Sequence, residues 1–404
     1  MPPEARQRYF ADLLSMPETH ELCAILLDRG FVESPTAYDS EEDLVENPSE
    51  QNTRWATCMY GGLFEFIQRY LQSIPKLHFD PEIFNRLYAD FEQYHLSDEV
   101  PFTSTVPLQG FSADEDCITF DADTRIIRLG HSQITRLASR GYFRWLPTDD
   151  FGLSRVKEVF SAGFAIQITY RLAKGQPISI PVEHEEADRI LTAVRLVRPG
   201  NASHNIIFTG PSAFYPLQQA PTAGWTEPLI HKGLGEALHL LTNDVGPCQS
   251  IWDSLNKLSQ QKKAAGLDVA VRKFNELYQR RSLEDRIIDM SILLESTLLH
   301  GQDRELRYRL ALRGAHLLKS TRPTKETFAL LKKFYDLRSK IVHQGQTLDA
   351  PVQTGRQSFP AAEFVAEMHS LCREVLHTFV TRLATGESID AVIETLNDAA
   401  LSEN

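Results

Sequence analysis

SLEDRIIDMSILLESTLLHG (residues 282–301) is followed by ELRYRLALRGAHLLKS (305–320) and KKFYDLRSKIVHQG (332–345), and these stretches decide the fold of the C-terminal part. In each, apolar residues recur every three or four positions, as in an amphipathic helix. Ser282 precedes an acidic residue by three positions, which resembles a capping box. Gly301 and Gly345 stand where helices commonly stop. The same pattern predicts helices over 229–243, 249–264, 267–281, 283–299, 303–319, 325–343, 360–384 and 388–400.

The chain before residue 229 has a mixed pattern. Residues 1–99 are predicted to be mostly helical, and residues 210–228, with four prolines, are predicted to be a linker. Residues 100–209 are expected to be rich in β-strands, with one helix over 186–198. The fold class is therefore an α+β N-terminal region, 1–209, followed by an all-α helical bundle, 229–404. The expected strands are DCITFDADTRIIRL (116–129), AGFAIQITYRL (162–172), PISIPVE (177–183) and NIIFTG (205–210), in a mainly antiparallel sheet.

The composition is that of an ordinary globular protein. The 404 residues are 42% hydrophobic and 24% charged, which excludes wholesale disorder and collagen-like repeats. No apolar run approaches the ~20 residues of a membrane-spanning helix, so we expect no membrane contact. The five cysteines are scattered without close pairs, which favours reduced thiols in the cytoplasm. Neither a zinc-ligand spacing nor a phosphate-binding glycine motif occurs, so no metal and no cofactor is predicted.

The charge is unevenly distributed. The net charge is -12, but residues 249–404 carry 22 basic and 20 acidic side chains, a balance of +2, which leaves -14 for residues 1–248. Within the C-terminal part, residues 304–340 hold eleven basic and three acidic residues, a balance of +8. Such an asymmetry indicates that the basic segment meets an anion.

Arg338 and His343 form an R-x-x-x-x-H arrangement near the end of the third stretch. Five residues turn an ideal helix by about 500°, which leaves the two side chains roughly 140° apart. They therefore do not share one helix face. Convergence requires a tightened last turn or a second subunit.

The three stretches together resemble the HEPN domain, specifically the ApeA-like HEPN family of prokaryotic proteins. The resemblance covers about residues 250–384. One departure is Gln344, because the family often has glycine directly after the histidine, whereas here glycine follows at Gly345. The residues that match the family pattern are Glu295, Ser296, Arg313, Gly314, Ala315, Tyr335, Arg338, Ser339 and His343.

The resemblance implies a metal-independent endoribonuclease, acting on RNA (a tRNA is one candidate) as a homodimer, in antiphage defence or a toxin system. A phage-derived trigger or partner would then act through the N-terminal region. Arg338 and His343 would be catalytic, supported by Ser339, Glu295, Arg313 and Tyr335. The residue chemistry fits, because imidazole transfers protons near neutral pH and guanidinium matches phosphate oxygens.

Three alternatives stay open at this point. The chain could be a catalytically silent HEPN module that binds a nucleotide or a partner. It could also be a structural scaffold or an antitoxin-like subunit. Glu295, in an apolar helix, could support the active site or be a buried carboxylate paired with an arginine such as Arg313.

Overall fold

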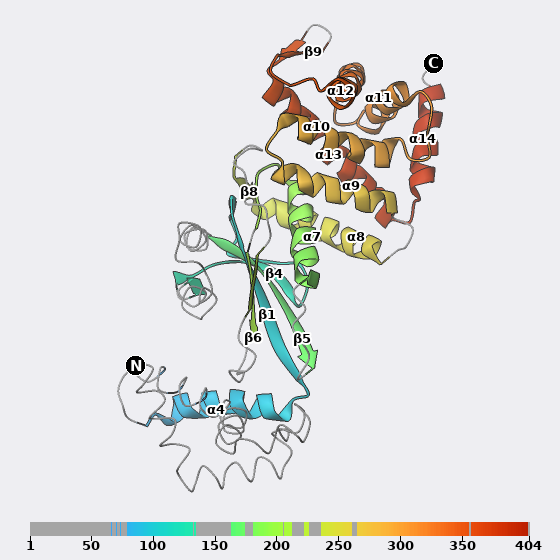
Figure 1. Cartoon of the computed structure of the whole chain (residues 1–404). Coiled ribbons are helices and arrows are strands. Elements are labelled where there is room, and N and C mark those ends of the chain that lie inside the picture. Colours follow the sequence, from blue (N-terminus) through green and yellow to red (C-terminus); the bar gives the residue numbers. More distant parts are fainter. Residues whose placement is uncertain are drawn as a thin grey trace, which may run out of the picture. The chain divides into compact units, whose positions relative to one another are not determined.

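A computed structural model gives the fold of the chain (Figure 1). The chain forms two compact units, one made of Met1–Thr103, Thr169–Ile178 and Thr209–Thr222, the other of Ser104–Ile168, Ser179–Phe208 and Ala223–Asn404. Helices and an antiparallel sheet are combined, and the C-terminal part is helical, which confirms the mixed fold class at this level. The structure describes residues 66, 70, 73, 79–131, 133–134, 163–173, 181–204, 206–211, 222–225, 236–260, 265–354 and 357–402.

Strands predicted from β-branched residues are present in the larger sheet. Antiparallel pairing joins β3 to β4 and β4 to β5, with Ile118 opposite Ile126 and Ile126 opposite Ile166. These isoleucines are buried, as expected for the apolar side of an alternating strand. The six strands have the order β3 (Cys117–Thr119), β4 (Thr124–Arg128), β5 (Phe164–Ala173), β1 (Glu99–Leu108), β6 (Ile206–Pro211) and β7 (Thr222–Trp225).

Helix α4, Pro81–Leu96, is the described part of the predicted N-terminal helical region. Asp80 caps it, since its carboxylate accepts hydrogen bonds from the backbone N–H groups of Glu82 and Ile83. Most of the rest of the predicted region 1–99 lies outside the described residues.

Helix α10 lies centrally in the C-terminal helical part (Figure 1). It packs against α9, α11, α12 and α13, while α7 packs against α8, α9 and α13. Ser282 caps α10 by accepting a hydrogen bond from the backbone N–H of Asp285, as its sequence predicted. The bounds are α7 Pro181–Val197, α8 Val245–Ser259, α9 Ala265–Glu276, α10 Leu283–Leu298, α11 Leu306–Leu317, α12 Thr324–Gln344, α13 Ala361–Ala384 and α14 Ile389–Ser402.

Three expectations from the sequence need correction, and one element was not expected. The helix over 229–243 is wrong at Leu238–Leu240, which is strand β8, paired in parallel with β2, Phe111–Ala113. The strand over 177–183 is wrong at its end, because α7 begins at Pro181, and proline is well tolerated at a first helical position. The linker 210–228 contains strand β7. A hairpin of β9 (Val352–Thr354) and β10 (Gln357–Phe359) was not predicted.

A cationic and aromatic cluster fills the space between α7, α9 and α13. The ring of His369 stacks on Phe274, with centroids 5.6 Å apart, and meets Tyr278 edge-on. Its Nε2 atom is buried without a hydrogen-bond partner among the described residues. Burial, and then the positive charges of Arg373 and Arg195, lower the pKa of His369 to about 3. His369 is therefore neutral in the folded protein.

We expect His369 to make the fold sensitive to acid. Unfolding returns the ring to an ordinary pKa near 6.5, so the unfolded chain binds a proton that the folded chain does not. Stability is then full above pH ~6.5 and falls by at most about 1.4 kcal/mol per pH unit between there and pH ~3. His369→Phe keeps an aromatic ring and should flatten this slope in urea unfolding measured at several pH values.

The matched control is Phe274→Leu, which disturbs the same aromatic cluster but keeps His369, and should leave the slope unchanged. The carboxylates titrate alike in both variants, so the difference reports His369. Equal slopes in the wild type and His369→Phe would contradict the assignment.

Candidate functional site

Helix α12 presents its two sides differently. Leu330, Leu331, Phe334, Leu337 and Ile341 are buried at helical spacing and fix which side of the helix faces the bundle. The side chains between them reach the surface or the neighbouring helix α10.

Arg338 leaves α12 toward α10 and pairs there with the predicted site residue Glu295. Its Nη2 atom lies 3.3 Å from Glu295 Oε1, and its Nε donates to Ser291 Oγ at 3.4 Å. The two charged side chains are 24% and 31% exposed, so water and ligands reach both. The arginine is thus held in place from one side and open on the other. The partner of Glu295 is Arg338, and not Arg313.

His343 lies in the last turn of α12 and is exposed. Its side chain makes no hydrogen bond or ion pair to the residues that the structure describes. The helix stays α-helical through Gln344 and ends at Gly345, whose φ of 63° is left-handed. The helix therefore ends at the glycine that the sequence indicated as its stop. The last turn is not tightened, so Arg338 and His343 of one chain point about 140° apart.

Tyr335 and Ser339 lie half-buried on α12. Tyr335 and Arg338 are three positions apart, and Val342, 47% exposed, follows four positions later. These three residues therefore share one helix face. Ser339, four positions after Tyr335 and three before Val342, lies on the same face by the same spacing.

Arg313 of α11 lies away from the Arg338–Glu295 pair. It is only 1% exposed, and its guanidinium donates to the carbonyl of Leu298 at 2.7 Å and to Asn397 Oδ1 at 2.9 Å. It thereby satisfies a free carbonyl at the C-terminal end of α10 and fastens α14. Gly314 beside it lets α11 approach α12, since a Cβ there would collide with Leu331. Arg313 thus has a structural role.

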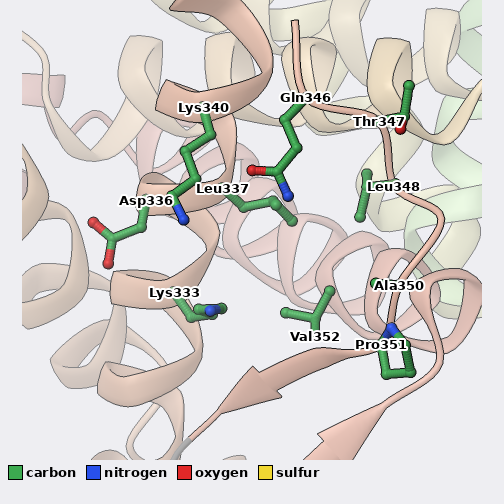
Figure 2. A pocket seen from close by; sticks show the side chains of 10 residues that line it. All are labelled: Lys333, Asp336, Leu337, Lys340, Gln346, Thr347, Leu348, Ala350, Pro351 and Val352. Atoms are coloured by element: carbon green, nitrogen blue, oxygen red, sulfur yellow. The ribbon is translucent and has the colours of Figure 1, made fainter. Parts of the chain in front are cut away.

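A small cleft lies on another side of α12 (Figure 2). The side chains of Lys333 and Lys340 come from the helix, and Gln346 comes from the loop after it. Asp336 also lines the cleft but is ion-paired with Arg307, so the two lysines dominate its charge. The backbone N–H of Leu348 donates to Glu284 of α10 at 2.7 Å, which fixes the loop. The cleft measures about 80 Å³ and is completed by Leu337, Thr347, Leu348, Ala350, Pro351 and Val352.

The sequence indicated this cleft only through the basic run 304–340. An excess of cations predicts an anion-binding surface, but it does not place one. The loop that closes the cleft has no motif of its own. Its position is held by the backbone contact of Leu348 to Glu284 and by the burial of Leu348 and Val352.

Comparisons with known protein families, curated proteins and solved structures identify no relative of the chain. Among the helices that the structure describes, none has the length and apolar character needed to cross a membrane.

The different settings of Arg313 and Arg338 predict different effects on stability. Arg313→Met leaves the Leu298 carbonyl and Asn397 unpaired in the interior and should lower the free energy of unfolding by about 2–4 kcal/mol. Arg338→Met removes a partly exposed ion pair and should cost less than about 1 kcal/mol. Urea unfolding of both variants measures this. A large loss in Arg338→Met would show that Arg338 supports the fold.

Proposed function

We propose that this protein is a metal-independent endoribonuclease of the HEPN type that acts as a homodimer, with Arg338 and His343 as its catalytic residues. The observation that carries the proposal is the exposure of both side chains on α12, within and just after the basic segment 304–340. An arginine needed only for folding is normally enclosed by partners, as Arg313 is. Arg338 is instead held by Glu295 and Ser291 with part of its guanidinium open.

The reaction needs a general base and a cation at the phosphate, and these two residues supply them. The 2′-hydroxyl of RNA attacks the adjacent phosphorus, so a base must take its proton, and imidazole does this near neutral pH. Negative charge grows on the phosphate oxygens in the transition state. The planar fork of a guanidinium binds two such oxygens at once. The expected product ends are a 2′,3′-cyclic phosphate or a 3′-phosphate and a 5′-hydroxyl.

Dimerisation is part of the proposal because one chain does not bring the two residues together. A second copy placed against α10 and α12 would set the Arg338 of one protomer near the His343 of its partner. Val342 is an exposed apolar residue on the Arg338 face, and Ile288 and Ile292 of α10 are only half-buried. Such partly covered apolar side chains are typical of a symmetric interface.

RNA would reach the site through the basic segment, because residues 1–248 carry a net charge of -14 and repel it. Lys333 and Lys340 in the cleft of Figure 2 would contact phosphates outside the scissile bond. In this proposal the enzyme works in the cytoplasm, in antiphage defence or abortive infection. The N-terminal region would then restrain it until a phage-derived trigger or partner protein binds.

A silent binding module is the second candidate. It is favoured by the ion pair between Arg338 and Glu295, because a carboxylate 3.3 Å from the guanidinium competes with a phosphate. In this case the same surface would bind a nucleotide or a partner without cutting RNA.

The two catalytic residues can be tested directly by substitution. His343→Ala removes the base, and Arg338→Ala removes the cation at the phosphate. Each should lower RNA cleavage by on the order of 10²-fold or more, and cleavage by the wild type should persist in EDTA. The double variant should lose little more activity than the less active of the two single variants, because both residues act in one transition state. Cleavage is followed on a labelled RNA, with product ends identified by mass spectrometry.

A matched control is Arg272→Ala, which removes an exposed cation of α9 outside the basic segment 304–340. It should change the rate only slightly. If His343→Ala or Arg338→Ala folds and cuts at the wild-type rate, these residues are not catalytic. RNA binding without any cleavage by the wild type would favour the silent module.

Mixed dimers test whether the residues act across subunits. Each single variant alone is inactive, but a dimer of one Arg338→Ala chain and one His343→Ala chain keeps one intact arginine and one intact histidine on different protomers. If they act together across the interface, mixing the two variants should raise activity at least ~10-fold above either alone. Residues that act within one chain would give no recovery, and the dimeric site would be disproved.

A further inference from the structure

Strands β2 and β8 bring together three polar side chains that the ribonuclease proposal does not use. In this parallel pair, Ser112 lies opposite His239, although 127 positions separate them in the sequence. Phe111 and Leu238 are buried, as are Ala113 and Leu240. Because side chains alternate along a strand, Ser112 and His239 lie on the outer face. Asp114, two residues after Ser112, follows on the same side.

The three side chains form a continuous hydrogen-bonded chain. Ser112 Oγ lies 2.8 Å from His239 Nδ1, and His239 Nε2 lies 3.0 Å from Asp114 Oδ1. The second carboxylate oxygen of Asp114 accepts a hydrogen bond from the backbone N–H of Thr242 at 3.2 Å. The aspartate is therefore oriented by the chain that follows β8. His239 and Asp114 are about half exposed, so the group is open to substrate.

We propose that Ser112 is a nucleophile activated by His239 and oriented through Asp114, and that it hydrolyses small, uncharged or cationic carboxylic esters. A hydroxyl within reach of an imidazole whose other nitrogen binds a carboxylate is the arrangement of acyl-transfer nucleophiles. Here the serine is on Nδ1 and the aspartate on Nε2, the reverse of the usual assignment. Either nitrogen of the ring can carry or accept the proton, depending on the tautomer, so the chemistry is retained.

The reaction has two balanced steps. Ser112 Oγ bonds to the ester carbonyl carbon while its proton passes to His239 Nδ1. The bond to the leaving alcohol breaks, and the alcohol takes that proton, which leaves an acyl-serine. Water then attacks the same carbon, gives its proton to His239 and releases the carboxylic acid, and His239 returns the proton to Ser112 Oγ. Asp114 stabilises the imidazolium in both steps.

The surroundings set the substrate class. Glu115 and Asp116 follow Asp114 directly and are exposed. Glu115 accepts a hydrogen bond from the Thr242 hydroxyl at 2.9 Å, and Asp116 is ion-paired with Arg128. The local carboxylates repel anionic esters and favour neutral or cationic ones. Access is open, so a small acyl group fits better than one that needs a deep pocket.

The test is covalent labelling of the full chain with a neutral fluorophosphonate. In that reaction Ser112 Oγ bonds to phosphorus, the P–F bond breaks, fluoride leaves, and the serine proton passes to His239. The modified residue is identified by mass spectrometry. Ser259 of α8 is an internal control, since it is exposed but its hydroxyl donates only to the carbonyl of Asn256. Ser112 should be labelled at least ~10²-fold faster than Ser259.

Variants separate catalysis from a structural link between the strands. His239→Gln should slow labelling of Ser112 by about 10²-fold or more and Asp114→Asn by at least ~10-fold, with the melting temperature nearly unchanged. Hydrolysis of p-nitrophenyl acetate should fall in parallel, and Ser112→Ala should abolish it. Labelling of Ser112 no faster than Ser259, or unchanged labelling in a folded His239→Gln, would overturn the proposal. The ribonuclease residues are not involved, so either proposal can fail alone.

Discussion

Arg195 is a buried cation that joins α7 to α9 in the compact unit that holds the C-terminal helices. Its guanidinium donates to the carbonyl of Ala202 through Nε and Nη2 and to Asn275 Oδ1 through Nη1, and it lies 3.9 Å from the ring centre of Tyr278. A charge removed from water costs several kcal/mol unless its donors are satisfied, so this geometry allows little freedom. It fixes α7 to α9. Helix α9 in turn is clamped to α10 by Asp289, whose carboxylate binds Lys273 of α9. These contacts position α10, whose Glu295 pairs with Arg338.

The helices from residue 245 onward were predicted within a few residues because each has a periodic apolar side and a recognisable end. Ser282 and Gly345 mark such ends, and both do so in the structure. The prediction was wrong where pairing is distant. The alternating pattern of Leu238–Leu240 is only three residues long. This segment forms a strand because it pairs with Phe111–Ala113, which is distant in the sequence. Local periodicity contains no information about such a partner.

Residue types at the candidate site could be read from the sequence, but their partners could not. The sequence left open whether Glu295 meets Arg313 or supports the active site, and the choice depends on how α11 and α12 cross α10. In the structure, α11 approaches Leu331 of α12 at Gly314, and the neighbouring Arg313 reaches the end of α10. The association of Ser112 with His239 was equally hidden, since it depends on strand register.

The ion pair of Arg338 and Glu295 has a consequence for how the proposed nuclease is restrained. A pair about a quarter to a third exposed is worth at most ~1 kcal/mol, so a phosphate that accepts two guanidinium N–H bonds can displace the carboxylate at little cost. Glu295 therefore orders the arginine in the free protein without blocking it. In the proposed dimer, restraint would then come from keeping Arg338 of one protomer apart from His343 of its partner. On this proposal, control over dimer assembly would be a more effective switch for the site than control over the ion pair of Arg338.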